Sequence, residues 1–169
     1  MRKSLFLVLL FIGSLSVHAG EGVTLWESGS EQGGWRAFGN GMLGAKATGD
    51  EVKLAVDWAE TSYGVGAVYE KSLPDLSNMK RLTVEARAGD ENGTVLAPEF
   101  AAGEKAFRVT AAHQQKLKSE WETHTFEIPD DFVKLNGNES IVTALRLLFI
   151  NPDKPGRADV YFRNARLVP

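Results

Sequence analysis

Apolar and polar residues alternate along most of this chain, a pattern typical of strands that bury one face. In the run 51–58, Val52, Leu54 and Val56 share one phase, and charged or small residues occupy the other. The run 81–88 repeats this pattern. Further extended runs are predicted at 23–26, 42–47, 63–70, 94–100, 106–112, 121–128, 144–150 and 158–168.

Turn residues separate these runs. Gly49-Asp50 indicates a tight turn, and the cluster at 89–93 (GDENG) predicts a hairpin. A brief helix is expected at 130–135, and the sequence has no long amphipathic helical pattern. Many short strands with regular turns predict an all-β fold, a sandwich or a barrel, in one domain over residues 20–169. The first and last strands are expected to pair.

The first residues follow a different pattern. Arg2 and Lys3 precede the unbroken apolar run 5–12, and Val17 and Ala19 are the small residues that signal peptidase requires. The apolar run is shorter than the roughly 20 residues that span a bilayer. We therefore expect residues 1–19 to be a signal peptide cleaved after Ala19. The protein is then secreted to the periplasm or the medium, without membrane insertion.

Charge and composition narrow the range of partners. The formal net charge is −3, and a nucleic-acid partner would need a concentrated basic face. We therefore expect no nucleic acid. The chain has no cysteine, which excludes thiol nucleophiles, thiolate metal sites and a lipid-modified N-terminal cysteine.

Five segments of the sequence occur in a recognisable order. They are Leu25-Trp26-Glu27 followed by Trp35, then Val52–Val56, Pro74–Leu82, Trp121–Ile128 and Val160–Leu167. In this order they resemble the galactose-binding-like jelly-roll family, which includes carbohydrate-binding modules. The resemblance covers nearly all of residues 20–169 and implies a jelly-roll β-sandwich with a polysaccharide or oligosaccharide as ligand. It implies the fold more strongly than the function, because this fold carries many ligands.

The same resemblance bears on metal binding. Modules of this family often hold a structural calcium between an acidic residue after the first strand and an aspartate on the last strand. Glu27 matches the first position, but Arg163 stands where the aspartate is expected. Calcium requires several oxygen ligands, so a cation at this place disfavours the ion. We predict no metal and no cofactor, and we expect Arg163 to pair with Glu27 or Asp159 instead.

Aromatic side chains are candidate platforms for a sugar, since a pyranose ring presents apolar C–H groups. Trp58 and Tyr63 bracket the loop 59–62, and loops commonly carry binding residues. The alternative is that Trp58 closes one end of the core, because tryptophan is mostly buried. The other three tryptophans lie within strand patterns, and core packing is expected for them.

Polar side chains in the outward phase of the strands define a candidate binding face. Where the apolar residues of a strand point inward, the residues between them point outward. The outward set comprises Glu85, Arg87, Arg108 and Arg146. Guanidinium and carboxylate groups bond paired sugar hydroxyls well. The alternative is a solvated face with cross-strand ion pairs, each worth well under about 1 kcal/mol.

The sequence contains no recognisable catalytic motif. His113 could act as a general base, but no serine nucleophile motif or zinc-binding histidine motif accompanies it, and His124 is isolated in a strand. Both histidines are expected at the surface. A carboxylate pair such as Glu85 and Glu99 would suit a glycosidase, although sequence spacing does not bring them together.

These observations favour an exported, non-catalytic protein that binds a glycan on an outer sheet face. Trp58 and Tyr63 would stack on the sugar, and the four polar residues of the outward set would bond its hydroxyls. A polysaccharide-active hydrolase or lyase that uses the same face is one alternative. A periplasmic structural or protein-interaction domain is the other.

Overall fold

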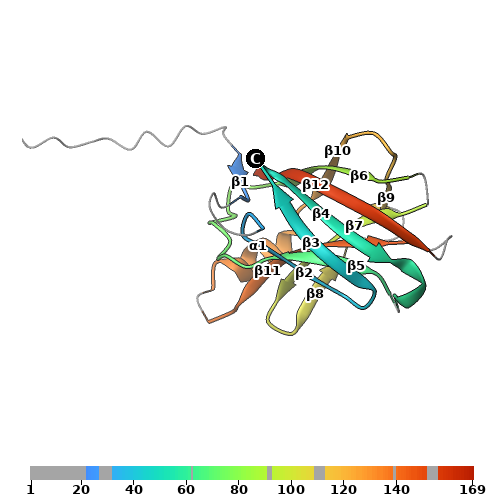
Figure 1. Cartoon of the computed structure of the whole chain (residues 1–169). Coiled ribbons are helices and arrows are strands. Elements are labelled where there is room, and N and C mark those ends of the chain that lie inside the picture. The colour runs from blue at the N-terminus through green and yellow to red at the C-terminus, as the bar shows by residue number, and fades with distance from the viewer. Residues whose placement is uncertain are drawn as a thin grey trace, which may run out of the picture.

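A computed structural model describes most of the chain and gives an all-β architecture. The described residues are 22–26, 32–61, 63–90, 93–108, 113–138, 140–151 and 156–169. The predicted signal peptide, residues 1–19, lies outside them. Two antiparallel sheets pack face to face, which confirms the predicted β-sandwich (Figure 1).

The first sheet, sheet A, has the strand order β10-β6-β12-β4-β3, with β1 paired to β12. Its strands are β1 (Val23–Thr24), β3 (Met42–Thr48), β4 (Glu51–Asp57), β6 (Arg81–Ala88), β10 (Glu122–Glu127) and β12 (Arg157–Val168). The predicted turn at Gly49-Asp50 joins β3 to β4. The short β1 pairs with the end of β12, as expected for the first and last strands.

The second sheet, sheet B, has the strand order β2-β5-β11-β7-β8, with β9 paired to β7. Its strands are β2 (Trp35–Phe38), β5 (Val65–Tyr69), β7 (Val95–Ala102), β8 (Lys105–Arg108), β9 (Gln115–Lys116) and β11 (Thr143–Ile150). Two short helical segments, the 3-10 turn η1 (Trp58–Glu60) and α1 (Asp130–Asn136), lie in connections. The predicted brief helix is therefore confirmed as α1, whose Phe132 packs against Phe100 of β7.

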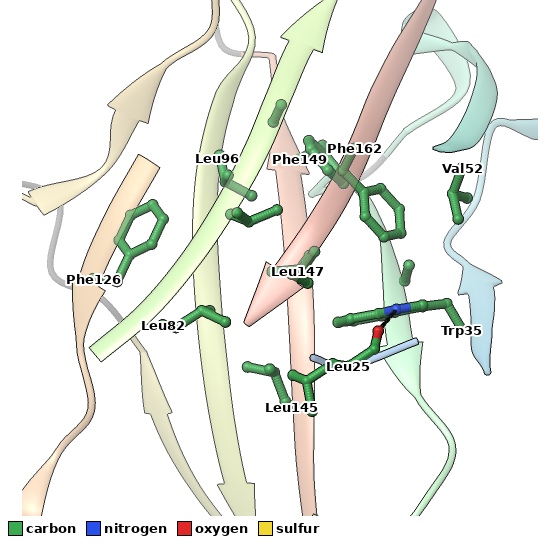
Figure 2. Close-up of a cluster of buried hydrophobic side chains, with 14 of the residues drawn as sticks. Leu25, Trp35, Val52, Leu82, Leu96, Phe126, Leu145, Leu147, Phe149 and Phe162 are labelled. Carbon is green, nitrogen blue, oxygen red and sulfur yellow. Dashed lines mark hydrogen bonds between the residues drawn. The ribbon is translucent and has the colours of Figure 1, made fainter. Parts of the chain in front are cut away.

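The core lies between the two sheets and follows the alternation seen in the sequence. Along β6, Leu82, Val84 and Ala86 are buried, and the residues between them are not. Trp35 of sheet B packs edge-on against Phe162 of sheet A, with ring centroids 5.2 Å apart. Its Nε1 donates a hydrogen bond of 2.9 Å to the carbonyl of Leu25 (Figure 2). These contacts join the two sheets near the first strand.

One predicted connection is wrong. The cluster 89–93, part of which lies outside the described residues, was expected to form a hairpin. The strands on either side of it, β6 and β7, belong to different sheets. Turn residues therefore mark a change of direction here, but they do not determine which strand becomes the hydrogen-bonded neighbour.

In the part of the chain that the structure describes, no helix has the length and apolar character needed to cross a bilayer.

Candidate functional site

The predicted binding residues do not share one face. Glu85 and Arg87 project outward from β6 in sheet A, because the residues between them are buried. Arg146 projects outward from β11 in sheet B, and Arg108 belongs to β8 of that sheet. The outer surfaces of two packed sheets point in opposite directions, so the expected single face is wrong. Alternation separates inside from outside, but it does not say to which sheet a strand belongs.

The centre of the outer face of sheet B carries a sheltered ion pair. Arg146 of β11 and Glu99 of β7 are register partners, and Nη1 of Arg146 lies 2.5 Å from Oε1 of Glu99. The Glu99 side chain is 2% exposed, whereas the Arg146 side chain is 41% exposed. A carboxylate buried to this degree requires a charged or hydrogen-bonding partner. The pair is therefore a fixed polar centre that solvent reaches through Arg146.

An aromatic ring lies on the same outer face as this pair, in a neighbouring cross-strand row. Strand pairing places Phe38, Gly66 and Leu148 in one cross-strand row on β2, β5 and β11. A Cβ atom at Gly66 would lie 2.7 Å from Cζ of Phe38, so glycine lets the phenyl ring lie against the sheet. Leu148 and its register partner Ala97 continue the row and are buried. The partly exposed ring of Phe38 can give the apolar contact that Trp58 was expected to provide.

Further polar and aromatic residues belong to the strands and connections of sheet B. On the edge strand β2, Nε of Arg36 lies 2.5 Å from Oε1 of Glu70. Tyr63 is 53% exposed and lies in the connection before β5, as a loop platform requires. Strand register places the backbone of Arg108 beside Glu99, and its side chain lies outside the described part of the structure. We refer to Phe38, Glu99 and Arg146 as the sheet B site.

Trp58 is not a surface platform. It is 5% exposed and belongs to the hydrophobic core. It continues the inward phase of Val52, Leu54 and Val56, and the turn η1 then carries the chain away from the core. The Asp57 side chain caps this turn by accepting a hydrogen bond from the backbone N–H of Ala59. The phase of the preceding strand was the sequence signal that could have placed Trp58 inside.

The outer face of sheet A carries a more open ion pair. Glu85 accepts hydrogen bonds from Nε of Arg163 at 2.7 Å and from Nδ2 of Asn164 at 2.8 Å. The hydrogen bond from Asn164, followed by that from Arg163, lowers the pKa of Glu85 below its usual value. Arg163 was expected to pair with Glu27 or Asp159. Glu27 lies outside the described residues, and Arg163 pairs with its cross-strand neighbour Glu85 instead.

Aromatic residues also reach this face. The guanidinium carbon of Arg87 lies 3.8 Å from the ring centroid of Tyr161 and 5.1 Å from that of Trp121. Trp121 was expected in the core, but it is partly exposed and stands in the outward phase of β10. His124, expected at the surface, stands in the inward phase and is 3% exposed. Both predictions are wrong because strand phase was not followed through β10.

Two chemical possibilities can be compared with this geometry. Glu85 and Glu99 lie on the outer faces of different sheets, so they do not flank a common substrate as a glycosidase pair does. Among the described residues, no group of three or more histidine, cysteine, aspartate or glutamate side chains is arranged to hold a metal ion. The expected absence of a metal and a cofactor stays a prediction.

Comparisons with known proteins relate the architecture to solved structures. No protein-family model and no curated protein matches the sequence. The xylan-binding module CBM15 matches with 16% identity and a TM-score of 0.56, over 86% of this chain and 97% of that chain. A CBM4 structure matches with 17% identity and a TM-score of 0.54, over 80% and 95%.

A third match is the family 11 carbohydrate-binding module from Clostridium thermocellum in complex with a β-1,3-1,4-mixed-linked tetrasaccharide. Its identity is 15% and its TM-score 0.53, over 88% of this chain and 95% of that chain. At such identities the likeness establishes the fold. The chain has the jelly-roll β-sandwich of carbohydrate-binding modules, as the sequence resemblance implied.

Proposed function

We propose that this protein is an exported, non-catalytic carbohydrate-binding protein that holds a glycan on the outer face of sheet B. The observation that carries the proposal is the ion pair between Arg146 and Glu99. Glu99 is buried although it projects from the outer side of the sheet, and Arg146 extends from it toward solvent. A fixed, partly desolvated polar pair of this kind is suited to bonding hydroxyl groups.

The side chains of the sheet B site have complementary roles. The planar guanidinium of Arg146 has several N–H donors in a rigid arrangement, and its ion pair with Glu99 limits its motion. Such a fork can donate to two neighbouring sugar oxygens. Phe38 offers a ring face to the C–H groups of a pyranose, and burial of this apolar surface adds affinity. Arg36 shares a cross-strand row with Val68 and Arg146 and can contact a more distant part of the ligand. The exposed Tyr63, in the connection before β5, is a further candidate for contact with the ligand.

The spacing of the site favours an oligosaccharide. Phe38 and Arg146 lie two strands apart and two residues apart along the register. Typical strand spacing and rise then separate their Cα atoms by roughly 12 Å. This separation is greater than the length of one sugar ring. This separation favours a ligand of two or more linked sugars over a single sugar.

Three further observations support the proposal. The solved structures of similar fold include a xylan-binding module and modules in complex with a β-1,3-1,4-mixed-linked tetrasaccharide and with β-1,4-galactotriose. The carboxylates first considered for catalysis lie on opposite faces. The sequence pattern of residues 1–19 supports export, and amino-terminal sequencing of the exported protein should begin at Gly20.

The binding proposal can be tested with matched arginine variants. A glycan array identifies a neutral oligosaccharide ligand, and calorimetry then measures its affinity for each variant. Arg146→Lys keeps the charge opposite Glu99 but removes the planar fork, and we expect affinity to fall about tenfold or more. Phe38→Ala should weaken binding by a similar factor through loss of the ring contact.

The control is Arg163→Lys, which makes the same change in the Arg–Glu pair of the opposite face. It should leave the affinity unchanged. Loss of affinity in this control together with an unaffected Arg146→Lys variant would place the ligand on sheet A. Turnover of the bound glycan would overturn the non-catalytic part of the proposal, and failure to bind any glycan would overturn the proposal itself.

A further inference from the structure

The outer face of sheet A carries a row in which aromatic and cationic residues alternate. Tyr161 on β12 is the register partner of Arg87 on β6 and of Lys53 on β4. Trp121 immediately precedes β10, whose first residue pairs with Ala86, so it stands next to Arg87. We call Trp121, Arg87, Tyr161 and Lys53 the aromatic–cation row. It crosses four neighbouring strands on the side opposite the sheet B site.

Arg87 is held between the two rings of this row. Its guanidinium carbon lies 3.8 Å from the ring centroid of Tyr161 and 5.1 Å from that of Trp121. Contacts of this kind attract the cation to the ring and remove water from the faces of the guanidinium plane. The side chain is therefore positioned before any ligand arrives, and little conformational entropy is lost when it binds.

Arg87 differs from its charged neighbours in its partners. Lys53 lies 2.6 Å from a carboxylate oxygen of Asp159, and Arg163 lies 2.7 Å from one of Glu85. All three cations also contact a ring of the row. Within the described residues, however, Arg87 has no carboxylate partner, and its Nε is buried without a hydrogen-bond acceptor. The row therefore contains a fixed and partly desolvated positive charge that forms no ion pair with an acidic group of the described residues.

We propose that Arg87 binds the carboxylate of an acidic saccharide, a hexuronate, on the outer face of sheet A. A carboxylate matches the guanidinium fork better than any neutral sugar group. The neighbouring Glu85 and Asp159 lie on either side of the row and repel a second negative charge. They therefore favour a singly charged carboxylate over a phosphate group. The flanking rings of Trp121 and Tyr161 give apolar contact to the sugar.

This site is separate from the sheet B site, and the two can be tested independently. The probe is a trimer of α-1,4-linked galacturonate, and the matched neutral probe is its methyl ester. The four tryptophans of the chain each give an indole N–H signal in a ¹H–¹⁵N spectrum. The acidic trimer should shift the Trp121 signal and leave that of the buried Trp35 in place. The methyl ester should shift neither signal at the same concentration.

Variants of Arg87 then test its role. Arg87→Gln should weaken binding of the acidic trimer about 10- to 100-fold, because a hydrogen bond between charged groups is lost. Arg87→Lys keeps the charge without the fork and should give a smaller loss. Arg81→Gln, which removes an arginine from the other end of β6, should bind the acidic trimer as the parent does. Thermal unfolding followed by circular dichroism checks that each variant is folded.

Several results would overturn this inference. One is equal binding of the acidic trimer and its methyl ester. Another is loss of acidic-trimer binding in Arg146→Lys with retention in Arg87→Gln, which would assign the carboxylate to sheet B. Displacement of the trimer by an equal concentration of inorganic sulfate would show an anion site without preference for a sugar. Failure of the neutral-glycan test leaves these measurements unaffected, so the two proposals can fail separately.

Discussion

The two outer faces of the sandwich carry the same kind of ion pair in different surroundings. On sheet B, Glu99 is almost fully buried beneath an accessible Arg146. On sheet A, Glu85 and Arg163 are 28% and 33% exposed, so both partners are reached by water. Solvent screens the second pair, whereas the first is shielded from it. The same type of ion pair, arginine with glutamate, is therefore a fixed polar centre on one face and a hydrated pair on the other.

The aromatic residues of the two faces differ in a related way. On sheet B, Phe38 lies against a glycine and Glu99 against an arginine, so the ring and the charges are in separate rows. On sheet A, the rings of Tyr161 and Trp121 contact the cations directly. A ring such as Phe38, which contacts no cation among the described residues, suits a neutral sugar, and a cation stacked on rings suits an anionic one. This contrast underlies the two ligand classes proposed above.

The largest loss of stability is expected in the hydrophobic core that separates the two outer faces. Trp58→Ala removes a buried indole and should lower the free energy of unfolding by about 3–5 kcal/mol. The glycan affinity of the folded variant should stay within about twofold, because neither face uses this side chain. Urea unfolding and calorimetry below the transition measure the two quantities. A stable variant with lost affinity would restore Trp58 as a platform and contradict its assignment to the core.

The ion pairs themselves should differ in stability. Arg146→Met leaves the buried carboxylate of Glu99 without its arginine partner, and we expect a loss of about 3 kcal/mol. Arg163→Met removes a solvated partner from Glu85, which keeps its bond from Asn164, and should cost under about 1 kcal/mol. Urea unfolding of both variants gives the comparison. Equal losses of unfolding free energy in the two variants would mean that solvent screens the two ion pairs to the same extent.

The double variant Glu99→Gln with Arg146→Met serves as the control for that experiment. It removes the buried charge of Glu99 as well as its arginine partner. It should recover part of the stability lost in Arg146→Met. No recovery would indicate that packing of the arginine stem, and not the buried charge, accounts for the loss.

Much of the fold follows from local pattern alone. The alternation of 81–88 gives β6 correctly, since one phase is wholly apolar and one is polar. The same reasoning applied further along each strand would have placed Trp58 inside and Trp121 outside. The predictions for Trp58 and Trp121 were wrong because the alternation of inward and outward residues was not continued to the residue next to each strand. The two-residue β9 carries too little pattern to be predicted.

The arrangement of the site depends on contacts that local pattern does not encode. Glu85 meets Arg163 across 78 residues of chain, and Glu99 meets Arg146 across 47. Which strands become neighbours depends on long-range pairing and packing of the two sheets. The sequence therefore identifies Arg87, Arg146 and Glu85 as outward residues, but it does not divide them between two faces. Tyr63 is exposed, as its loop position predicts, because a loop position is a local property; its role in binding stays a prediction.

A smaller effect is expected at the irregularity of β12. The register shifts between Arg163 and Arg166, and Asn164 adopts φ 50°, in the left-handed region. Asn164→Ala should cost about 1–2 kcal/mol, because alanine is strained in this region and the bond to Glu85 is lost. Asn164→Gly keeps the backbone unstrained and should cost under about 1 kcal/mol. Thermal unfolding separates the two variants, and equal losses would show that backbone strain makes no contribution.

At one edge of the sandwich, a buried histidine joins the two sheets and should make stability depend on pH. His124 of β10 belongs to sheet A, and its Nδ1 lies 2.9 Å from Oε1 of Gln115, in β9 of sheet B. Its Nε2 is buried without a hydrogen-bond partner in the described part of the chain. Burial lowers the pKa of His124 below 6.5, against smaller opposing effects of the Ala86 backbone and the Glu122 charge.

The direction of the effect follows from proton uptake. Below about pH 6.5 the unfolded chain binds a proton at this position more readily than the folded protein does. The free energy of unfolding should therefore fall as pH decreases through 6.5, with one proton limiting the slope to about 1.4 kcal/mol per pH unit. His124→Gln should flatten this slope relative to the parent protein. Urea unfolding of the parent and the variant between pH 5 and 8 measures the slope, and a slope that persists in His124→Gln would contradict the assignment of this pH dependence to the buried histidine.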